Sequence, residues 1–295
     1  MSLFSRIGWM LWALVPVAVI AFHFGPGQGL AARERAASSF QAAALLEKEA
    51  IQAQELAYLA HLAAIEARRS TFLAGDETLE SSEELSRALA REREAYEVAG
   101  DRWEAAAEAY EQVEGQLSEE DEDVVLGIRW SKARARVRSG AVWDGAVELE
   151  GLLVDLDSTS SNEGQKKLAR AAREELAVAY YFGARLMRES GEPAIDWRAQ
   201  ALRARQHFRY LAETAVAAGE NDAVVRGLED NVERTIDLEQ MDKSELEGRP
   251  LPRQSPRAAR GNRPGPGQRP GISQRPPTRR DGRGAGGAGP IGPGW

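Results

Sequence analysis

The distribution of proline constrains this chain more than any other feature. Of its 13 prolines, only Pro193 lies between Pro26 and Pro250. Proline lacks a backbone donor and clashes with the preceding turn, so the interior of a helix tolerates it poorly. The long middle of the chain is therefore predicted to be entirely helical.

Glycines predict where these helices end, because a helix commonly terminates at a glycine in the left-handed conformation. Gly75, Gly100, Gly140, Gly191 and Gly219 each follow a long segment that is suited to a helix. Connections between most segments are short, so neighbouring helices are expected to be antiparallel. We expect helices over residues 31–74, 82–99, 102–116, 119–138, 142–156, 163–189, 195–217 and 221–242.

The most apolar part of the chain follows a short N-terminal segment, residues 1–6. Residues 7–24 read IGWMLWALVPVAVIAFHF and carry no formal charge at neutral pH. A helix of this length spans about 27 Å, which matches the hydrocarbon core of a bilayer. We therefore expect a transmembrane signal-anchor helix at residues 7–24 and a flexible Gly/Pro exit at residues 25–30.

Other interpretations of this region stay open. A cleaved signal peptide could end at residues 29–31, although its apolar region would be longer than usual. The charges around the apolar segment orient it weakly, because Arg6 precedes it and Arg33 and Arg35 follow it. We expect a single-pass membrane protein whose helical domain is extracytoplasmic, with a cytoplasm-facing anchor as the alternative.

A local pattern recurs after forty residues. Gly100-x-x-Trp103-x-x-Ala106 is repeated as Gly140-x-x-Trp143-x-x-Ala146, and a looser copy begins at Gly191 and includes Trp197. Self-similarity at a period of 20–50 residues is typical of stacked helical hairpins. Each copy would end one helix at its glycine and begin the next helix near its tryptophan.

This pattern resembles the tetratricopeptide repeat (TPR), in which an aromatic residue follows the turn and small residues let the paired helices approach. Trp103 and Trp143 stand at the aromatic position, and Gly183 suits the close-packing position of the third copy. The spacing departs from the family by one residue, and the period changes between copies. The resemblance covers residues 82–217 and implies an all-α, TPR-like α-solenoid of antiparallel helix pairs over residues 31–242. A generic helical bundle is the alternative.

Catalytic chemistry finds little support in the sequence. The chain has no cysteine and three histidines, His23, His61 and His207, and it lacks the HExxH, GxSxG and GxxxxGK[ST] motifs. We therefore expect no enzymatic activity, no cofactor, no metal site and no small-molecule substrate. An enzyme with an unrecognised site is the alternative.

The first helix of each pair lines a concave groove in the tetratricopeptide family. Four arginines and two aromatics there would suit an acidic or carboxylate-terminated peptide of an unidentified protein, through charge-assisted hydrogen bonds and stacking. The alternative is a solvated arginine face with the tryptophan in the core. Carrying the groove positions over to this chain gives Trp130, Arg134, Arg138, Tyr181, Arg185 and Arg188.

The C-terminal part has a different composition. Residues 249–295 hold ten arginines against Asp281 alone, a charge of +9 in a chain whose net charge is −8. Low apolar content with many glycines and prolines predicts a disordered tail over residues 248–295. Such a tail could bind anionic lipid, a cell-envelope polyanion or nucleic acid. The residues that would do so are Arg257, Arg260, Arg263, Arg269, Arg275, Arg279, Arg280 and Arg283.

The sequence as a whole therefore predicts a membrane-anchored, noncatalytic scaffold. A TPR-like body would hold another protein, between an N-terminal anchor and a polycationic tail. The alternative function is an anchor whose arginine-rich tail provides the binding activity.

Overall fold

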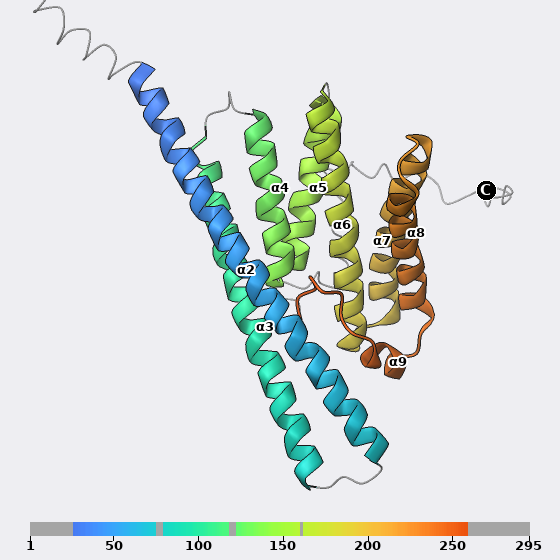
Figure 1. Cartoon of the computed structure of the whole chain (residues 1–295). Helices are drawn as coiled ribbons and strands as arrows, with labels where there is room; N and C mark the ends of the chain where they lie inside the picture. Colours follow the sequence, from blue (N-terminus) through green and yellow to red (C-terminus); the bar gives the residue numbers. More distant parts are fainter. Residues whose placement is uncertain (1–25, 75–78, 118–121, 160–161, 259–295) are drawn as a thin grey trace, which may run out of the picture.

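The computed structural model describes residues 26–74, 79–117, 122–159 and 162–258, and in these ranges it is all-α (Figure 1). Seven long helices and one short helix account for most of the described residues. They are α2 (Pro26–Ala74), α3 (Leu79–Glu114), α4 (Glu122–Ser139), α5 (Val142–Thr159), α6 (Glu163–Glu189), α7 (Ala194–Ala217), α8 (Asp222–Gln240) and α9 (Lys243–Gly248).

Each long helix packs mainly against the next one along the chain, from α2 against α3 through to α7 against α8. Helices two apart also touch. Helix α4 contacts α6, and Ala43 and Ala50 of α2 share buried clusters with Ile128 and Ala135 of α4. Contacts that stay between near neighbours are typical of repeat proteins. The described body is therefore compatible with a helical-repeat fold.

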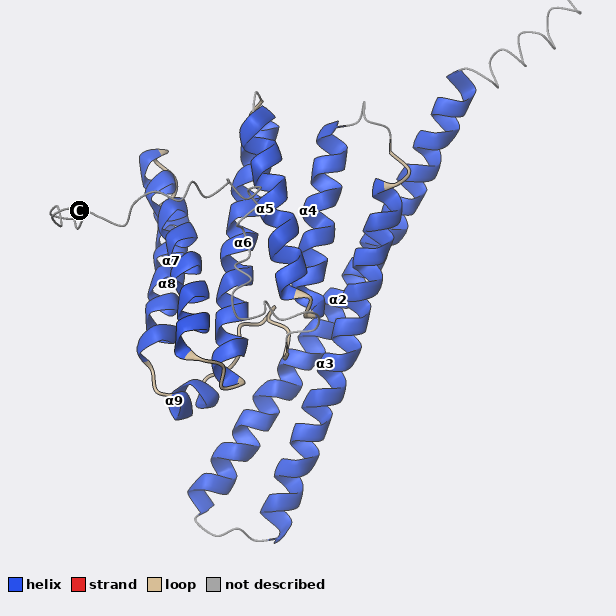
Figure 2. Cartoon of the chain, turned by 180° about the vertical axis from the view of Figure 1, so that it is seen from behind, coloured by secondary structure: helices blue, strands red, loops and turns tan. Residues whose placement is uncertain are grey.

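Helices α2 and α3 form a long antiparallel hairpin that lies along one side of the body (Figures 1 and 2). Alanine occupies every seventh position of the buried face of α2, and all five alanines are 4% exposed or less. Side chains this small let α3 approach α2 closely along a seven-residue repeat. The alanines are Ala36, Ala43, Ala50, Ala57 and Ala64.

Three of the predicted helix ends are confirmed at glycines. Gly140, Gly191 and Gly219 have φ values of 102°, 81° and 66°, and each follows the end of a helix. Most residue types are strained in this region of backbone space, whereas glycine enters it without a steric penalty. The predicted boundaries of α6 agree with the structure, and those of α4, α5, α7 and α8 differ by a few residues.

Gly100 does not end a helix, and here the prediction was wrong. The predicted helices 82–99 and 102–116 form one continuous helix, α3. The residues on both sides of Gly100 pack against the same helix, because Ala99 shares a buried cluster with Ala57 of α2, and Trp103 shares one with Ala50 of α2. A glycine inside a helix costs about 1 kcal/mol relative to alanine, and packing along α2 outweighs this cost. Trp103 is buried as expected, but at no hairpin turn.

The predicted flexible segment before the first helix is helical from Pro26 onward. Pro26 is the first residue of α2, and the glycines that follow it belong to the same helix. Proline suits the first turn of a helix, where its missing N–H would have no partner. The predicted exit at residues 25–30 is therefore corrected from Pro26 onward.

The predicted membrane localisation also needs correction. The apolar segment 7–24 lies outside the described residues. Within the described ranges, no helix contains a stretch both long enough and apolar enough to cross a bilayer. Even α2, the longest helix, is interrupted by charges such as Arg33, Glu34 and Arg35. This finding contradicts the expected single-pass protein with an extracytoplasmic helical domain, and we withdraw that assignment.

The start of the predicted disordered tail is packed against the body. Residues 249–258 leave α9 and pass between the α2–α3 hairpin and α6 (Figure 1). Leu251, Ser255 and Pro256 are buried there. Three prolines prevent this segment from forming a helix, but it still packs against helices of the body. Residues 259–295, and with them the remaining tail arginines, lie outside the described residues.

Candidate functional site

The candidate site holds the non-helical residues 249–258, which we call the docked segment. The side chains that contact the docked segment come chiefly from α2, α4 and α6, and α3 contributes one carboxylate. These helices are brought together by the contacts between alternate helices described above. We call the side chains that hold the segment the docking site: Gln54, His61, Glu92, Arg138, Arg185 and Glu189.

The docking site binds the main chain of the docked segment. The Gln54 side-chain amide donates to the carbonyls of Ser255 and Arg253 at 3.0 and 3.3 Å. Arg185 donates to the carbonyls of Arg249 and Pro250 at 2.7 and 3.0 Å. Gln54 and Arg185 are both buried, so these bonds also satisfy polar groups that would otherwise lack partners away from water.

His61 links the segment to a buried carboxylate. Its Nε2 lies 2.9 Å from the backbone N of Leu251, which can only donate, so Nε2 is the acceptor. Its Nδ1 lies 2.7 Å from Glu92 Oε1 and therefore carries the hydrogen of the neutral ring. The docked segment thus fixes the neutral Nδ1–H tautomer of His61.

Glu92 faces this histidine and the guanidinium of Arg257. Burial raises the pKa of the Glu92 carboxyl, but the hydrogen bond from His61 and the charges of Arg257 and Arg68 more than offset it, so the pKa lies below its usual value. Arg257 Nε is 2.9 Å from Glu92 Oε1, and Arg257 Nη1 is 3.4 Å from Glu189 Oε2. Two helices therefore hold one arginine of the segment.

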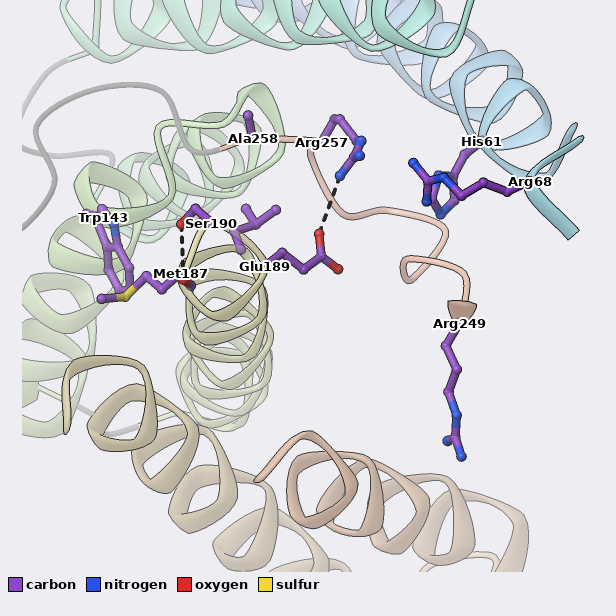
Figure 3. Close-up of a pocket in the computed structure, with 10 residues that line it drawn as sticks. His61, Arg68, Trp143, Met187, Glu189, Ser190, Arg249, Arg257 and Ala258 are labelled. Carbon is purple, nitrogen blue, oxygen red and sulfur yellow. Dashed lines mark hydrogen bonds and ion pairs between the residues drawn. The ribbon is translucent and has the colours of Figure 1, made fainter. Parts of the chain in front are cut away.

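A cavity of about 390 Å³ lies beside this ion pair. In Figure 3, Arg257 and Glu189 point toward each other, and His61 and Arg68 project from α2. Trp143 and Met187 form part of its apolar wall. The docked segment therefore borders the cavity without filling it.

An apolar hole between α2 and α3 receives Leu251, which is 2% exposed. Its walls are Ala57, Ala99 and Tyr96, with Ala53 and Ala95 at the margin. Small side chains on two adjacent helices leave room for one leucine. The hydroxyl of Tyr96 is buried here, and among the described residues it has no hydrogen-bond partner.

Two of the predicted groove residues, Arg138 and Arg185, belong to the docking site. Arg138 forms an ion pair with Glu175 of α6, stacks over Trp103 at 5.6 Å and donates to Gln254 Oε1 at 2.6 Å. Arg185 forms an ion pair with Glu189 at 2.9 Å in addition to its bonds to the segment. The site therefore contains arginines whose charges are already matched by carboxylates of the same body.

The other four predicted residues have partners elsewhere. Arg134 forms an ion pair with Glu47 of α2 and stacks over Trp130, which is partly buried against the main core. Arg188 donates to the carbonyls at the C-terminal end of α8 and stacks over Trp197 at 4.7 Å. Tyr181 is partly buried against the core. Arg134 and Arg188 thus hold helices together.

Sequence reasoning missed Gln54, His61, Glu92, Glu189 and Leu251. One signal was available, because Leu251 is the one large apolar residue among prolines and arginines in residues 249–258. A second was the capping sequence Asp242-x-x-Glu245, in which Asp242 accepts from the Glu245 backbone N at 2.8 Å and starts α9. Both features indicated that order continues beyond α8.

Among the described residues, the second histidine, His207, is not part of the docking site. His207 stacks against Tyr180 with ring centroids 5.9 Å apart. Burial, together with the charges of Arg173 and Arg203, lowers the pKa of His207 to about 4. Its ring is therefore neutral at pH 7, where it packs as a partly buried aromatic.

Comparisons with known proteins do not assign a family or a function to the docking site. No protein-family model matches the chain, and neither the search of curated proteins nor the search of solved structures produced a match.

Proposed function

We propose that this chain is a noncatalytic scaffold whose helical body holds a segment of another protein in the docking site. One observation carries the proposal: buried side chains of the body bind the main chain of a non-helical segment. Bonds to main-chain groups provide affinity without requiring a particular sequence, as in other peptide-binding sites. The docked segment is a ligand of this kind supplied by the chain itself.

We further propose that the body is a TPR-like solenoid with the pairs α2–α3, α4–α5 and α6–α7. Gly140 and Gly191 separate the helices of the last two pairs, and Trp143 and Trp197 are buried near the start of the second helices. Five of the six docking-site residues lie on α2, α4 and α6, the first helix of each pair. The family lines its groove with these helices, which supports the proposal.

The test is site-directed capture of the partner in cells. A photoreactive residue is placed at Gln54, and a control chain carries it at Val154, which is 69% exposed on α5. We expect a defined partner to crosslink at position 54 and not at position 154. Equal yields at both positions would overturn the proposal, because they would reflect general surface exposure.

A matched pair of substitutions tests the same proposal without a crosslinker in the site. Arg185→Glu reverses a charge that binds the segment, whereas Arg198→Glu reverses an exposed charge at the start of α7. Partner capture should be lost in the first variant and kept in the second, with equal helicity by circular dichroism. Gln54→Ala serves as the docking-site variant if Arg185→Glu does not fold.

A further inference from the structure

We infer that the docking site recognises basic, proline-containing peptides of the pattern Leu-Pro-Arg-x-x-Pro-Arg, and that residues 249–258 occupy it as an internal competitor. This inference rests on the proposed function and names the chemistry of its ligand. The inferred ligand is basic, whereas the groove arginines predicted an acidic peptide. The difference arises because carboxylates of the docking site contact the ligand.

Charge decides the class of peptide. Arg138 and Arg185 are paired with Glu175 and Glu189, so they offer hydrogen bonds to the ligand but little unmatched positive charge. Glu92 is 3% exposed and faces the ligand with a carboxylate. A buried carboxylate is costly unless a cation is paired with it, and Arg257 provides that cation. A peptide with an acidic residue at this position would place two negative charges together.

A second arginine has a weaker role. Arg253 forms an ion pair with Glu55 of α2 and lies 5.9 Å from the ring centroid of Tyr58. Arg253 is exposed and Glu55 is partly exposed, so the expected contribution of this ion pair is small. Arg253 therefore adds charge complementarity, whereas Arg257 adds specificity.

The leucine hole fixes the register of the peptide. Leu251 lies six residues before Arg257, and its neighbours Pro250 and Pro252 have no N–H group to satisfy. The N–H of Leu251 itself is bound by His61. Proline also restricts the unbound peptide, which lowers the entropy lost on binding. Leucine between two prolines is therefore well matched to this part of the site.

The chain's own segment is an incomplete ligand. The buried Tyr96 hydroxyl has no partner in the described ranges, and the 390 Å³ cavity beside Arg257 is bordered but not filled. An internal ligand does not need to fit well, because attachment to the same chain gives it a high effective concentration, on the order of millimolar for short linkers. A peptide that also satisfies Tyr96 would displace it.

The experiment measures binding of a labelled peptide to the full-length chain by fluorescence anisotropy. The probe is a synthetic peptide with the sequence of residues 248–258. The double variant Leu251→Ala/Arg257→Ala weakens the internal ligand without changing the docking site. We expect this variant to bind the probe at least about tenfold more tightly than the wild-type chain. Equal affinities would overturn the inference.

Two controls establish the chemistry of the ligand. A probe with glutamate at the position of Arg257 should bind the double variant at least about tenfold more weakly than the original probe. Adding Glu92→Gln to the double variant should weaken the original probe by a similar factor. If the acidic probe binds as well as the basic one, the inference is wrong. The single variant Arg257→Ala replaces the double variant if circular dichroism shows that the latter is unfolded.

The outcomes separate this inference from the proposed function. If a partner crosslinks at position 54 in cells but the basic probe does not bind, the proposed scaffold function stands. The inference that the ligand is a basic peptide is then wrong. A wild-type dimer that the double variant does not form, seen by size-exclusion chromatography with light scattering, would mean that the segment docks on a second copy. That result would contradict the inference that residues 249–258 compete for the docking site of their own chain.

Discussion

Single residues set how closely the helices approach, and Gly183 is the clearest case. A Cβ atom added at Gly183 would lie 2.3 Å from Cη2 and 2.7 Å from Cζ2 of Trp143. Trp143 is 5% exposed and belongs to the main core. Only a residue without a side chain lets α6 lie against this indole, as the sequence resemblance predicted for Gly183.

We therefore expect Gly183→Ala to lower the free energy of unfolding by about 1–3 kcal/mol, because the core must shift to accept the methyl group. Gly151 of α5 is the control, since an added Cβ there meets no atom within 4 Å. Gly151→Ala should raise stability by about 0.5–1 kcal/mol through helix propensity. Urea denaturation compares the two, and equal shifts would contradict the close contact.

His207 predicts a pH dependence at the same scale. Its folded-state pKa of about 4 lies below the ordinary value of 6.5, so the unfolded chain binds the proton more strongly. Stability from this residue is fully present above pH 6.5 and is lost as the pH falls toward 4. His207→Gln should flatten the decline between pH 6.5 and 4 in urea denaturation. A decline of unchanged steepness would show that His207 is not the cause.

At the scale of the helices, the size of the side chains between two helices sets the distance between them. Ala50 is fully buried where α2 meets Trp103 of α3 and Ala135 of α4. The alanine repeat of α2 thus sets the distance between the helices of the hairpin. The same spacing produces the hole for Leu251, because alanines of α2 and α3 form its walls.

Ala50→Leu is therefore expected to destabilise the chain by about 1–3 kcal/mol, since the larger side chain would separate the helices. Ala44→Leu places the same change on the exposed face of α2 and should alter stability by less than about 0.5 kcal/mol. Thermal denaturation of both variants provides the comparison. Similar losses would mean that leucine disturbs α2 itself rather than its packing.

At the scale of the whole molecule, we expect the docked segment to detach from the body without unfolding it. Leu251 is as well buried as core leucines such as Leu149, but it sits on a chain of ten residues held mainly by side chains. Losing its contacts releases the segment without opening the helices. The cost of a substitution there is limited by the free energy of docking.

Leu149→Ala should accordingly lower the free energy of unfolding by about 2–5 kcal/mol, as expected for a leucine in a packed core. Leu251→Ala should change it by a smaller amount and should speed hydrogen exchange at the amide of residue 251, which His61 protects. Hydrogen exchange with mass spectrometry distinguishes the two. Equal losses of global stability would mean that the segment is part of the cooperative core.

The sequence by itself determined the all-helical class, most helix boundaries and the packing roles of Trp143 and Gly183. These follow from local rules, because proline and glycine act on the backbone within one turn, and the repeated spacing of glycine, tryptophan and alanine indicated the packing positions. The continuity of α3 through Gly100 was decided by tertiary structure, because α2 supports both sides of that glycine.

The docking site was also decided by tertiary structure. Gln54, Glu92, Arg185 and Leu251 are far apart in the sequence, and none belongs to a local motif that links it to the others. The groove arginines were found from their spacing, but spacing does not reveal that carboxylates of neighbouring helices neutralise them. Composition predicted a disordered tail because it averages over many residues. Leu251 contradicts that average, because one hole between two helices holds its side chain.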